Sequence, residues 1–491
     1  MNPSSITTCL KHRALLLAAA SALAGGCALQ TPPRDVSVAV PPQWFAPYPS
    51  ADAPGALPHN GRLIDLTQWW MQQGDPLLVE LIASAQAVSP SIASARSRIE
   101  QARASRVAAG AALVPTLDAT ASSSRTRLPP QAPGASALAT TAQAGLQASW
   151  EMDLFGGKQA SRNAAIERLA GAEARWHDAR VSVAAEVANQ YYNYTSCRAL
   201  EAITRADAAS RRETARLADL SMKAGFTAPA TAALARASAG DASARATEQA
   251  ARCELDVKAL VAISALPEPD LKQKLALAPV ILAQAAPILI ADVPADALAQ
   301  RPDIFAAARE VAAASDDIGI AQAERYPRLG LSGSIGTSRV RSGGVSSDFN
   351  TWSIGPLSLT VPLFDGGRRA ADVDAATARY DDAAATYRGR VRQAVREVEQ
   401  ALVNLQSTAA RRADVQTAVD GYQASFSGTE ALYKNGLTSL VELEDSRRTL
   451  LTAQTTLASL QQSRNTAWVS LYRAMGGGWT PTVNAAGLPA R

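Results

Sequence analysis

Two pairs of residues have types and spacings that could carry chemistry. Cys197 and Cys253 lie 28 residues before and 28 residues after Gly225. If the chain reverses direction at this glycine, the two thiols lie at the same height on neighbouring antiparallel helices. We therefore predict a disulfide in preference to two free buried thiols. The required Cα separation of about 4.4–6.8 Å means that the rotation of the helices decides whether it forms.

The second pair is acidic. Glu442 and Asp445 are spaced i and i+3, so a helix would place both carboxylates on one face. Such a face either has a function or is simply solvated, and the nearby Glu444 shows that acids are common in this stretch. The residues alone leave both interpretations open.

Nothing else in the sequence resembles an active site. His59 and His177 remain once His12 is assigned to a leader segment, and their spacing is not that of metal ligands. The sequence has no phosphate-binding loop and no nucleophile elbow, and Gly476–Gly478 is typical of a helix end. We therefore predict no enzyme, no metal and no cofactor other than a covalent lipid.

The composition favours long, closely packed helices. Of the 491 residues, 47% are apolar, with alanine supplying much of this, and only 5% are aromatic. The net charge of +4 is spread along the chain. Because a nucleic-acid binder should carry a concentrated basic patch, nucleic acid is not an expected partner.

The N-terminus is typical of an export signal. Lys11 and Arg13 precede an apolar stretch, Ala14 to Leu23, that is too short to cross a bilayer permanently. The sequence LAGGC, which ends at Cys27, is similar to the processing box of bacterial lipoproteins. We expect Cys27 to become the lipidated first residue. The alternative is an ordinary signal peptide with an incidental cysteine.

The chain contains an internal duplication of about 210 residues. Five anchors recur in the same order at shifts of 210 to 212: Pro90 and Pro302, Leu117 and Leu329, Gly156 and Gly366, Val187 and Val398, and Gly225 and Gly436. The expected segments are a signal peptide (1–26), a lipid anchor with an extended equatorial segment (27–74), a first repeat (75–264), an equatorial linker (265–294), a second repeat (295–475) and a C-terminal tail (476–491).

Each copy has the same order of elements. An alanine-rich helix, expected at 75–113 and at 295–325, ends near a proline. Two strands of about 10–13 residues follow, and residues 146–154 alternate apolar and polar side chains as a strand with one apolar face does. In the second copy this alternation changes phase at Gly355–Pro356, which predicts a β-bulge.

A glycine pair then precedes a long helix, starting near Lys158 and Arg368. The spacing of Val391, Val395, Val398, Leu402 and Leu405 is that of a coiled-coil seam. Gly225 and Gly436 are expected to end these helices, where the chain reverses and a second helix returns.

Strands with one apolar face suit a membrane barrel, but four strands per chain would leave open edges in the bilayer. The strands must therefore pair with other chains in a closed ring. Three chains would supply twelve strands, and six chains would also close. The expected fold is mainly α with a membrane β-barrel: long coiled-coil helices form an α-barrel, and four strands per chain join those of other copies, with the number of copies left open by the residues alone.

The sequence resembles the TolC family of outer-membrane efflux channels, close to its OprM-like and NodT-like lipoproteins. The stretches that carry the resemblance are LAGGC, SWEMDLFGGK, RPDIFAAAREVAAASDDIGIAQAERYPRLGLSGSIG, LTVPLFDGGR, KNGLTSLVELEDS and LYRAMGGGW. The resemblance implies a homotrimer with a 12-stranded outer-membrane β-barrel and a periplasmic α-barrel. It also implies that this homotrimer serves as the exit duct of a tripartite pump for drugs or other small molecules. Its implied partners are a periplasmic adaptor and an inner-membrane transporter of the resistance-nodulation-division type.

The resemblance also implies roles for the hairpin turns. The adaptor docking tips would be Gly225, Phe226, Thr227, Gly436, Leu437 and Thr438. Glycine is also the usual residue at a helix C-terminus, and both interpretations can hold together. Glu442 and Asp445 match the family's acidic pore gate, while the first copy has Thr231 and Leu234 there. Arg447 and Arg448 are expected ion-pair partners that keep the gate closed.

Two other functions fit parts of the pattern. A TolC-like channel for type I protein secretion has the same fold, but the lipoprotein box and the GGGW ending favour drug efflux. A periplasmic adaptor lipoprotein should lack paired strands, which this chain has in both copies.

Overall fold

The structure is a computed structural model that describes residues 29–46, 69–128, 137–277, 298–342 and 345–479. Cys27, the signal segment and His59 lie outside these ranges. The chain divides into two compact units. Unit 1 contains residues 1–37, 98–172 and 306–387, and unit 2 contains residues 38–97, 173–305 and 388–491.

The order of elements repeats as the sequence predicts. The first copy contains α3 (Trp69–Gln72), α4 (Pro76–Val88), α5 (Pro90–Ala111), β1 (Thr116–Leu128), β2 (Ala137–Met152), α6 (Gly157–Lys223), α7 (Pro229–Ser264) and α8 (Glu268–Leu277). The second contains α10 (Pro302–Ala323), β3 (Arg328–Ser342), β4 (Val345–Thr360), α11 (Arg368–Lys434), α12 (Leu440–Ala474) and the 3₁₀ turn η1 (Gly476–Gly478). Helices α6 and α11 have 67 residues each, so each is about 100 Å long.

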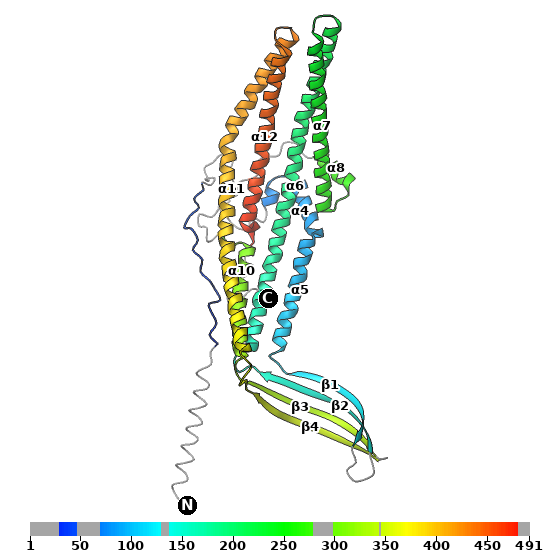
Figure 1. Cartoon of the computed structure of the whole chain (residues 1–491), viewed down its shortest axis with the longest axis vertical. Coiled ribbons are helices and arrows are strands. Elements are labelled where there is room, and N and C mark those ends of the chain that lie inside the picture. The colour runs from blue at the N-terminus through cyan, green and yellow to red at the C-terminus, as the bar shows by residue number, and fades with distance from the viewer. Residues whose placement is uncertain (1–28, 47–68, 129–136, 278–297, 343–344, 480–491) are drawn as a thin grey trace, which may run out of the picture. The chain divides into compact units, whose positions relative to one another are not determined.

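The four strands of unit 1 form one antiparallel sheet in the order β1-β2-β3-β4 (Figure 1). They have 13 to 16 residues, somewhat more than expected. The predicted bulge is present: Leu331 pairs with Leu357 but Gly333 pairs with Ile354, so the register shifts opposite Gly355–Pro356. Because β1 and β4 are the outer strands, each has one edge without a partner strand among the described residues.

The apolar face of the sheet is not buried within the chain. Leu117, Leu146, Ile335 and Leu359 are exposed, at 45% to 68% of their surface, and Ile354 is exposed at 84%. The alternation of residues therefore predicts the strands correctly, but a single chain leaves their apolar side chains uncovered.

The helix expected at 75–113 is wrong as one element. It is two helices, α4 and α5, bent by 49°. Ser89 between them has φ −62° and ψ 123°, an extended conformation, because Pro90 disfavours a helical residue before it. In the second copy, helix α10 begins at Pro302, later than the expected 295, and residues 295–297 lie outside the described part. The linker expected at 265–294 begins with helix α8.

No single helix in the described part of the chain has both the length and the hydropathy of a membrane-spanning segment. One bent pair, α4 with α5, meets that test by length and composition.

The strand-to-helix junctions need glycine for a backbone reason. Gly156 has φ +79°, and Gly366 and Gly367 have φ +66° and +91°, values that side chains rarely allow. An aspartate caps the helix that follows in each copy. Asp153 accepts from the amides of Lys158 and Gln159 at 3.0 and 2.8 Å, and Asp365 accepts from those of Gly367 and Arg369 at 3.0 and 3.2 Å.

The N-terminal described segment of unit 1 lies along α10. Ser315 Oγ donates to the carbonyl of Pro32 at 2.6 Å, and Tyr380 of α11 donates to that of Pro33 at 2.8 Å. Arg34 pairs with Glu167 at 3.0 Å and with Asp316 at 2.8 Å. Burial raises the pKa of Asp316 to about 6 despite Arg34. This part of the expected extended segment is therefore fixed to the helices at specific points.

Unit 2 contains the larger apolar core. Helices α4, α6, α7, α11 and α12 supply its buried side chains, among them Leu78, Tyr191, Leu260, Leu402 and Trp468. Val398, Leu402 and Leu405 of the predicted coiled-coil seam are all buried. Asp75 accepts a hydrogen bond from the Tyr191 hydroxyl at 2.6 Å, and burial together with this contact raises the pKa of that tyrosine.

Candidate functional site at the hairpin turns

Both helical hairpins reverse by the same backbone motif. In the first, the amide of Gly225 donates to the carbonyl of Met222 and that of Phe226 to Ser221, at 3.0 and 2.9 Å. In the second, the amide of Gly436 donates to Tyr433 and that of Leu437 to Leu432, at the same distances. This is the Schellman arrangement, which needs a left-handed residue, and the two glycines have φ +82° and +75°. Helix termination therefore explains both glycines.

The amides of the residues after the two glycines belong to the turn, but their side chains have no such structural role. Phe226 is exposed at 86% and Leu437 at 72% of their surface. In a Schellman motif this position usually packs against the preceding helix. One apolar side chain is thus left exposed at each of the two corresponding turns.

The two threonines of the turns differ in their contacts. Thr227 shares a hydrogen bond with Ser221 at 2.6 Å, within the first turn. Thr438 donates to the carboxylate of Glu442, and Ser439 accepts from the Glu442 amide at 3.1 Å as the N-cap of α12. Glu442 therefore lies in the first turn of a helix, where a negative charge is favoured.

Glu442 and Asp445 are both exposed on α12. Asp445 pairs with Arg448 at 3.4 Å, and both side chains are about 70% exposed. This contact agrees with the expectation that Arg448 is an ion-pair partner. Between these two acids Leu443 is fully buried. Glu442 and Asp445 therefore lie on the outer side of α12, and Leu443 lies on its inner side.

Arg447 forms an ion pair, but with an acid other than the two expected at the gate. This residue does not pair with Glu442 or Asp445: it is buried, and Nη1 bonds to Glu444 Oε1 at 2.6 Å. Nη2 donates to the hydroxyls of Ser210 and Thr214 of α6, at 3.0 and 3.1 Å. The reason is the helical period, since Glu444 and Arg447 are spaced i and i+3 and so both lie on the inward side of α12.

Glu444 also binds Arg211 of α6, and Arg211 pairs with Asp207 at 2.9 Å. We call Asp207, Arg211, Glu444 and Arg447 the clasp. Their side chains are 3% to 12% exposed, so two cations and two anions share one nearly dry site between the two hairpins. Ser238 of α7 completes it, donating to Glu444 at 2.8 Å.

The two positive and two negative charges of the clasp balance one another, but removing them from water costs free energy. Burial lowers the pKa of Arg211, which Asp207 opposes, and burial lowers that of Arg447 in the same way. Removing one partner from such a group leaves an uncompensated buried charge. Sequence reasoning missed the clasp because Glu444 looked like one more surface acid. Its equivalent in the first copy is Ala233, so the duplication gave no signal either.

The predicted disulfide is present. Cys197 of α6 and Cys253 of α7 are bonded, with a Cα–Cα distance of 5.5 Å. Gln249 donates to the carbonyl of Cys197 at 3.4 Å and contacts its sulfur at 3.1 Å. The bond fixes the two helices of the first hairpin far from the turn.

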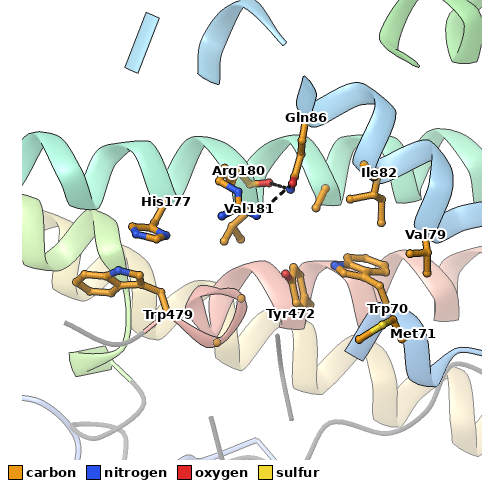
Figure 2. A pocket seen from close by; sticks show the side chains of 14 residues that line it. Trp70, Met71, Val79, Ile82, Gln86, His177, Arg180, Val181, Tyr472 and Trp479 are labelled. Carbon is orange, nitrogen blue, oxygen red and sulfur yellow. Dashed lines mark hydrogen bonds between the residues drawn. The ribbon is translucent and has the colours of Figure 1, made fainter. Parts of the chain in front are cut away.

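A cavity of about 530 Å³ lies in unit 2 between α4, α6 and the end of α12. Figure 2 shows His177, Arg180 and Val181 of α6 facing Tyr472 and Trp479. Burial and the nearby Arg180 lower the pKa of His177. The lining residues include no carboxylate, serine or cysteine. In the described part of the chain no cluster of three metal-ligating side chains occurs.

Comparison with known proteins gives concordant results. The family model described as "Outer membrane efflux protein" matches twice, at residues 81–265 and 293–477. The chain is 32% identical to the solvent efflux pump outer membrane protein SrpC of Pseudomonas putida over 84% of this chain and 87% of that protein. It is 30% identical to the pyoverdine export outer membrane protein OpmQ of Pseudomonas aeruginosa, over 95% and 97%.

A solved structure has the same fold. The open state of the MtrE outer membrane channel of Neisseria gonorrhoeae superimposes with a TM-score of 0.76 at 25% identity, covering 92% of this chain and 99% of that one. The two family matches fall on the two copies seen in the structure.

Proposed function

Because this chain belongs to the outer membrane efflux protein family and is an outer-membrane efflux channel, we propose that it works as a homotrimeric exit duct. Three copies with four strands each would close a twelve-stranded barrel. The observation that carries the proposal is the sheet. In the described part of the chain the outer edges of β1 and β4 are unpaired, and the apolar side chains of the sheet are exposed. Such a sheet is stable in a bilayer only when further strands complete it.

The two hairpins would form the periplasmic end of the duct, and the second would carry the gate. Three copies place three Glu442 and three Asp445 side chains around one axis. Repulsion among them and attraction for cations would make this ring a selective constriction. The exposed positions of both acids support this role.

The partners proposed are a periplasmic adaptor and an inner-membrane transporter of the resistance-nodulation-division type. The adaptor would contact the exposed Phe226 and Leu437 at the turns. The relatives above are named for solvent efflux and pyoverdine export. We propose small molecules such as drugs as cargo, with specificity residing in the transporter. The channel itself would be passive, with no catalysis and no cofactor beyond a lipid on Cys27.

The test is single-channel conductance of the purified protein in a planar bilayer. The wild type should show a small, cation-preferring conductance, and the Glu442→Ala/Asp445→Ala variant a larger and less selective one. Glu213→Ala is the matched control, because Glu213 is an exposed acid on the first hairpin whose partner is Arg216 at 2.6 Å. It should behave as the wild type.

Two other outcomes would count against parts of this proposal. Equal, large conductance of wild type and double variant would leave the duct but place the gate elsewhere. No conductance from any of the three proteins, despite correct insertion into the membrane, would contradict the duct.

A further inference from the structure

The cavity of unit 2 has the size and the walls of a small-molecule site. Its volume is about 530 Å³, and sites for small ligands are usually clefts of about 300–1,000 Å³ with apolar and aromatic walls and a few polar groups. Four of its lining residues carry aromatic rings, namely Trp70, His177, Tyr472 and Trp479. None of the four belongs to a strand or to a hairpin turn. The site is therefore separate from the parts of the chain that the proposed duct uses.

The rings form two groups. Trp70 and Tyr472 meet edge to face, with their ring centroids 4.7 Å apart. The rings of His177 and Trp479 lie 6.0 Å apart and are tilted against each other. Figure 2 shows one pair at each end of the cavity. Aromatic rings contact one another best in offset-stacked or edge-to-face arrangements. These walls therefore favour an occupant that is itself flat and aromatic.

The charge on the walls is positive. Arg180 is exposed, its guanidinium lies 5.0 Å from the centroid of the Trp176 ring, and it reaches the side-chain oxygen of Gln86 only at 3.5 Å. Burial and the nearby Arg180 lower the pKa of His177 from its usual 6.5, so the histidine is neutral at neutral pH. Because the lining residues include no carboxylate, nothing on the walls balances the charge of Arg180.

A buried hydrogen-bond donor faces the same space. Trp70 is 6% exposed, and its indole Nε1 has no hydrogen-bond partner among the described residues. Figure 2 shows this nitrogen on the edge of the ring that is turned toward Tyr472 and the middle of the cavity. The Tyr472 hydroxyl lies beside it but outside hydrogen-bond geometry. A buried donor without a partner costs free energy, which an acceptor on an occupant would recover.

We propose that this cavity binds a small aromatic anion, with a flat ring system between the two groups of rings and a carboxylate or sulfonate on Arg180. Trp70 Nε1 supplies a second donor. A guanidinium can bind such an acid group through two parallel hydrogen bonds. Aromatic walls also suit cations, but Arg180 would repel a cation here. A neutral ring would leave the charge of Arg180 unused.

Isothermal titration calorimetry of the purified full-length protein, with the detergent matched in both solutions, tests the ligand class. Naphthoate should bind saturably. Naphthamide has the same shape without the charge, and we expect it to bind about tenfold more weakly, because hydrogen bonds to charged groups are the stronger ones. Decahydronaphthoate keeps the charge but loses the flat ring, and it should bind about threefold more weakly than naphthoate.

Three variants locate the site. Arg180→Gln should weaken naphthoate binding about tenfold and leave naphthamide binding unchanged. Ala83→Trp fills the cavity from an exposed lining position and should abolish the binding of both compounds. Arg252→Gln is the matched control, because Arg252 is an exposed arginine of α7 that does not line the cavity and pairs with Glu248. It should bind both compounds as the wild type does.

A fourth variant tests the second donor. Trp70→Phe keeps an aromatic ring and removes the indole N–H. Naphthoate should then bind about threefold more weakly, the loss expected for one hydrogen bond. Circular dichroism of this variant shows whether the helices are retained. Undiminished binding in a folded Trp70→Phe protein would remove Trp70 Nε1 from the site.

Other results would overturn the inference as a whole. The first is the absence of saturable naphthoate binding to the wild type. The second is equal affinity for naphthoate and naphthamide, or equal naphthoate affinity of the wild type and Arg180→Gln, since either would mean that the charge is not recognised. Unchanged binding in Ala83→Trp would place the bound compound outside this cavity. The proposed duct is tested separately by conductance, and none of these results bears on it.

Discussion

The two helical hairpins have the same length and the same turn but are held together differently. Helices α6 and α11 both have 67 residues, and both hairpins reverse through a Schellman glycine. In the first hairpin, Cys197 and Cys253 join the helices covalently. The positions 211 residues later are Thr408 and Arg464, which cannot form such a bond.

The second hairpin carries a partly buried arginine at that height. The guanidinium of Arg464 is half-buried, and desolvation together with the nearby Arg412 lowers its pKa. The equivalent of Arg412 in the first copy is Glu201, a buried acid paired with Arg198 at 2.7 Å. Of the two duplicated hairpins, one is therefore stapled by a disulfide and the other has no such staple. The hairpin without the disulfide carries the acids proposed as the gate.

The clasp should have the largest effect, because it joins the two hairpins through buried charges. Arg447→Met leaves Glu444 with one partner fewer in a nearly dry site. Loss of one member of a buried ion pair costs about 3–5 kcal/mol. We expect a lower midpoint of thermal unfolding, followed by circular dichroism in detergent, and a larger single-channel conductance as the second hairpin is released.

The adjacent arginine is the control for that change. Arg448→Met removes the same side chain one residue later, where the ion pair with Asp445 is exposed and contributes little. Its unfolding midpoint should match the wild type. Equal loss of stability in both variants would show that the clasp has no special role in joining the hairpins.

The disulfide should have the next largest effect, confined to one hairpin. Cys197→Ser/Cys253→Ser removes a cross-link between residues 56 apart in sequence, for which a cost of about 2–4 kcal/mol is typical. Amide hydrogen exchange should become faster in α6 and α7 and stay unchanged in α11 and α12. Faster exchange in both hairpins alike would contradict the idea that the staple acts only on its own hairpin.

The opposite change introduces a disulfide into the second hairpin, which has none of its own. Thr408→Cys/Arg464→Cys places a staple at the equivalent height of the second hairpin. If opening depends on movement of that hairpin, the oxidised variant should conduct less than its reduced form. Equal conductance in the two redox states, with the bond shown to be present, would mean that opening does not need the unstapled helices to move apart.

Much of this architecture could be predicted from local rules. The glycine turns, the strands with one apolar face and the bulge at Gly355–Pro356 all follow from residue type and period within short stretches. The disulfide followed from equal distances to Gly225. The kink at Ser89 follows from the same rules, because Pro90 disfavours a helical residue before it.

The clasp could not be predicted in this way. It joins Asp207 and Arg211 to Glu444 and Arg447, which are more than 230 residues apart along the chain, and nothing in either segment marks the other. Which of three neighbouring acids faces inward depends on the rotation of α12 against α6. That rotation is set by packing of Leu443 and the alanines around it, not by any feature of the acids themselves.

The smallest effect should come from the turns, and it should be the same in both hairpins. Gly225→Ala and Gly436→Ala each force a side chain into a left-handed conformation, which costs about 1–2 kcal/mol. No other group lies within 4 Å of the added methyl carbon in either case, so the strain is purely conformational. The amides of Phe226 and Leu437 should therefore exchange about tenfold faster in their respective variants, by hydrogen exchange followed with mass spectrometry or NMR. Because the turns are alike, a much larger change at Gly436 than at Gly225 would show that the difference between the hairpins begins at the turn and not at the staple.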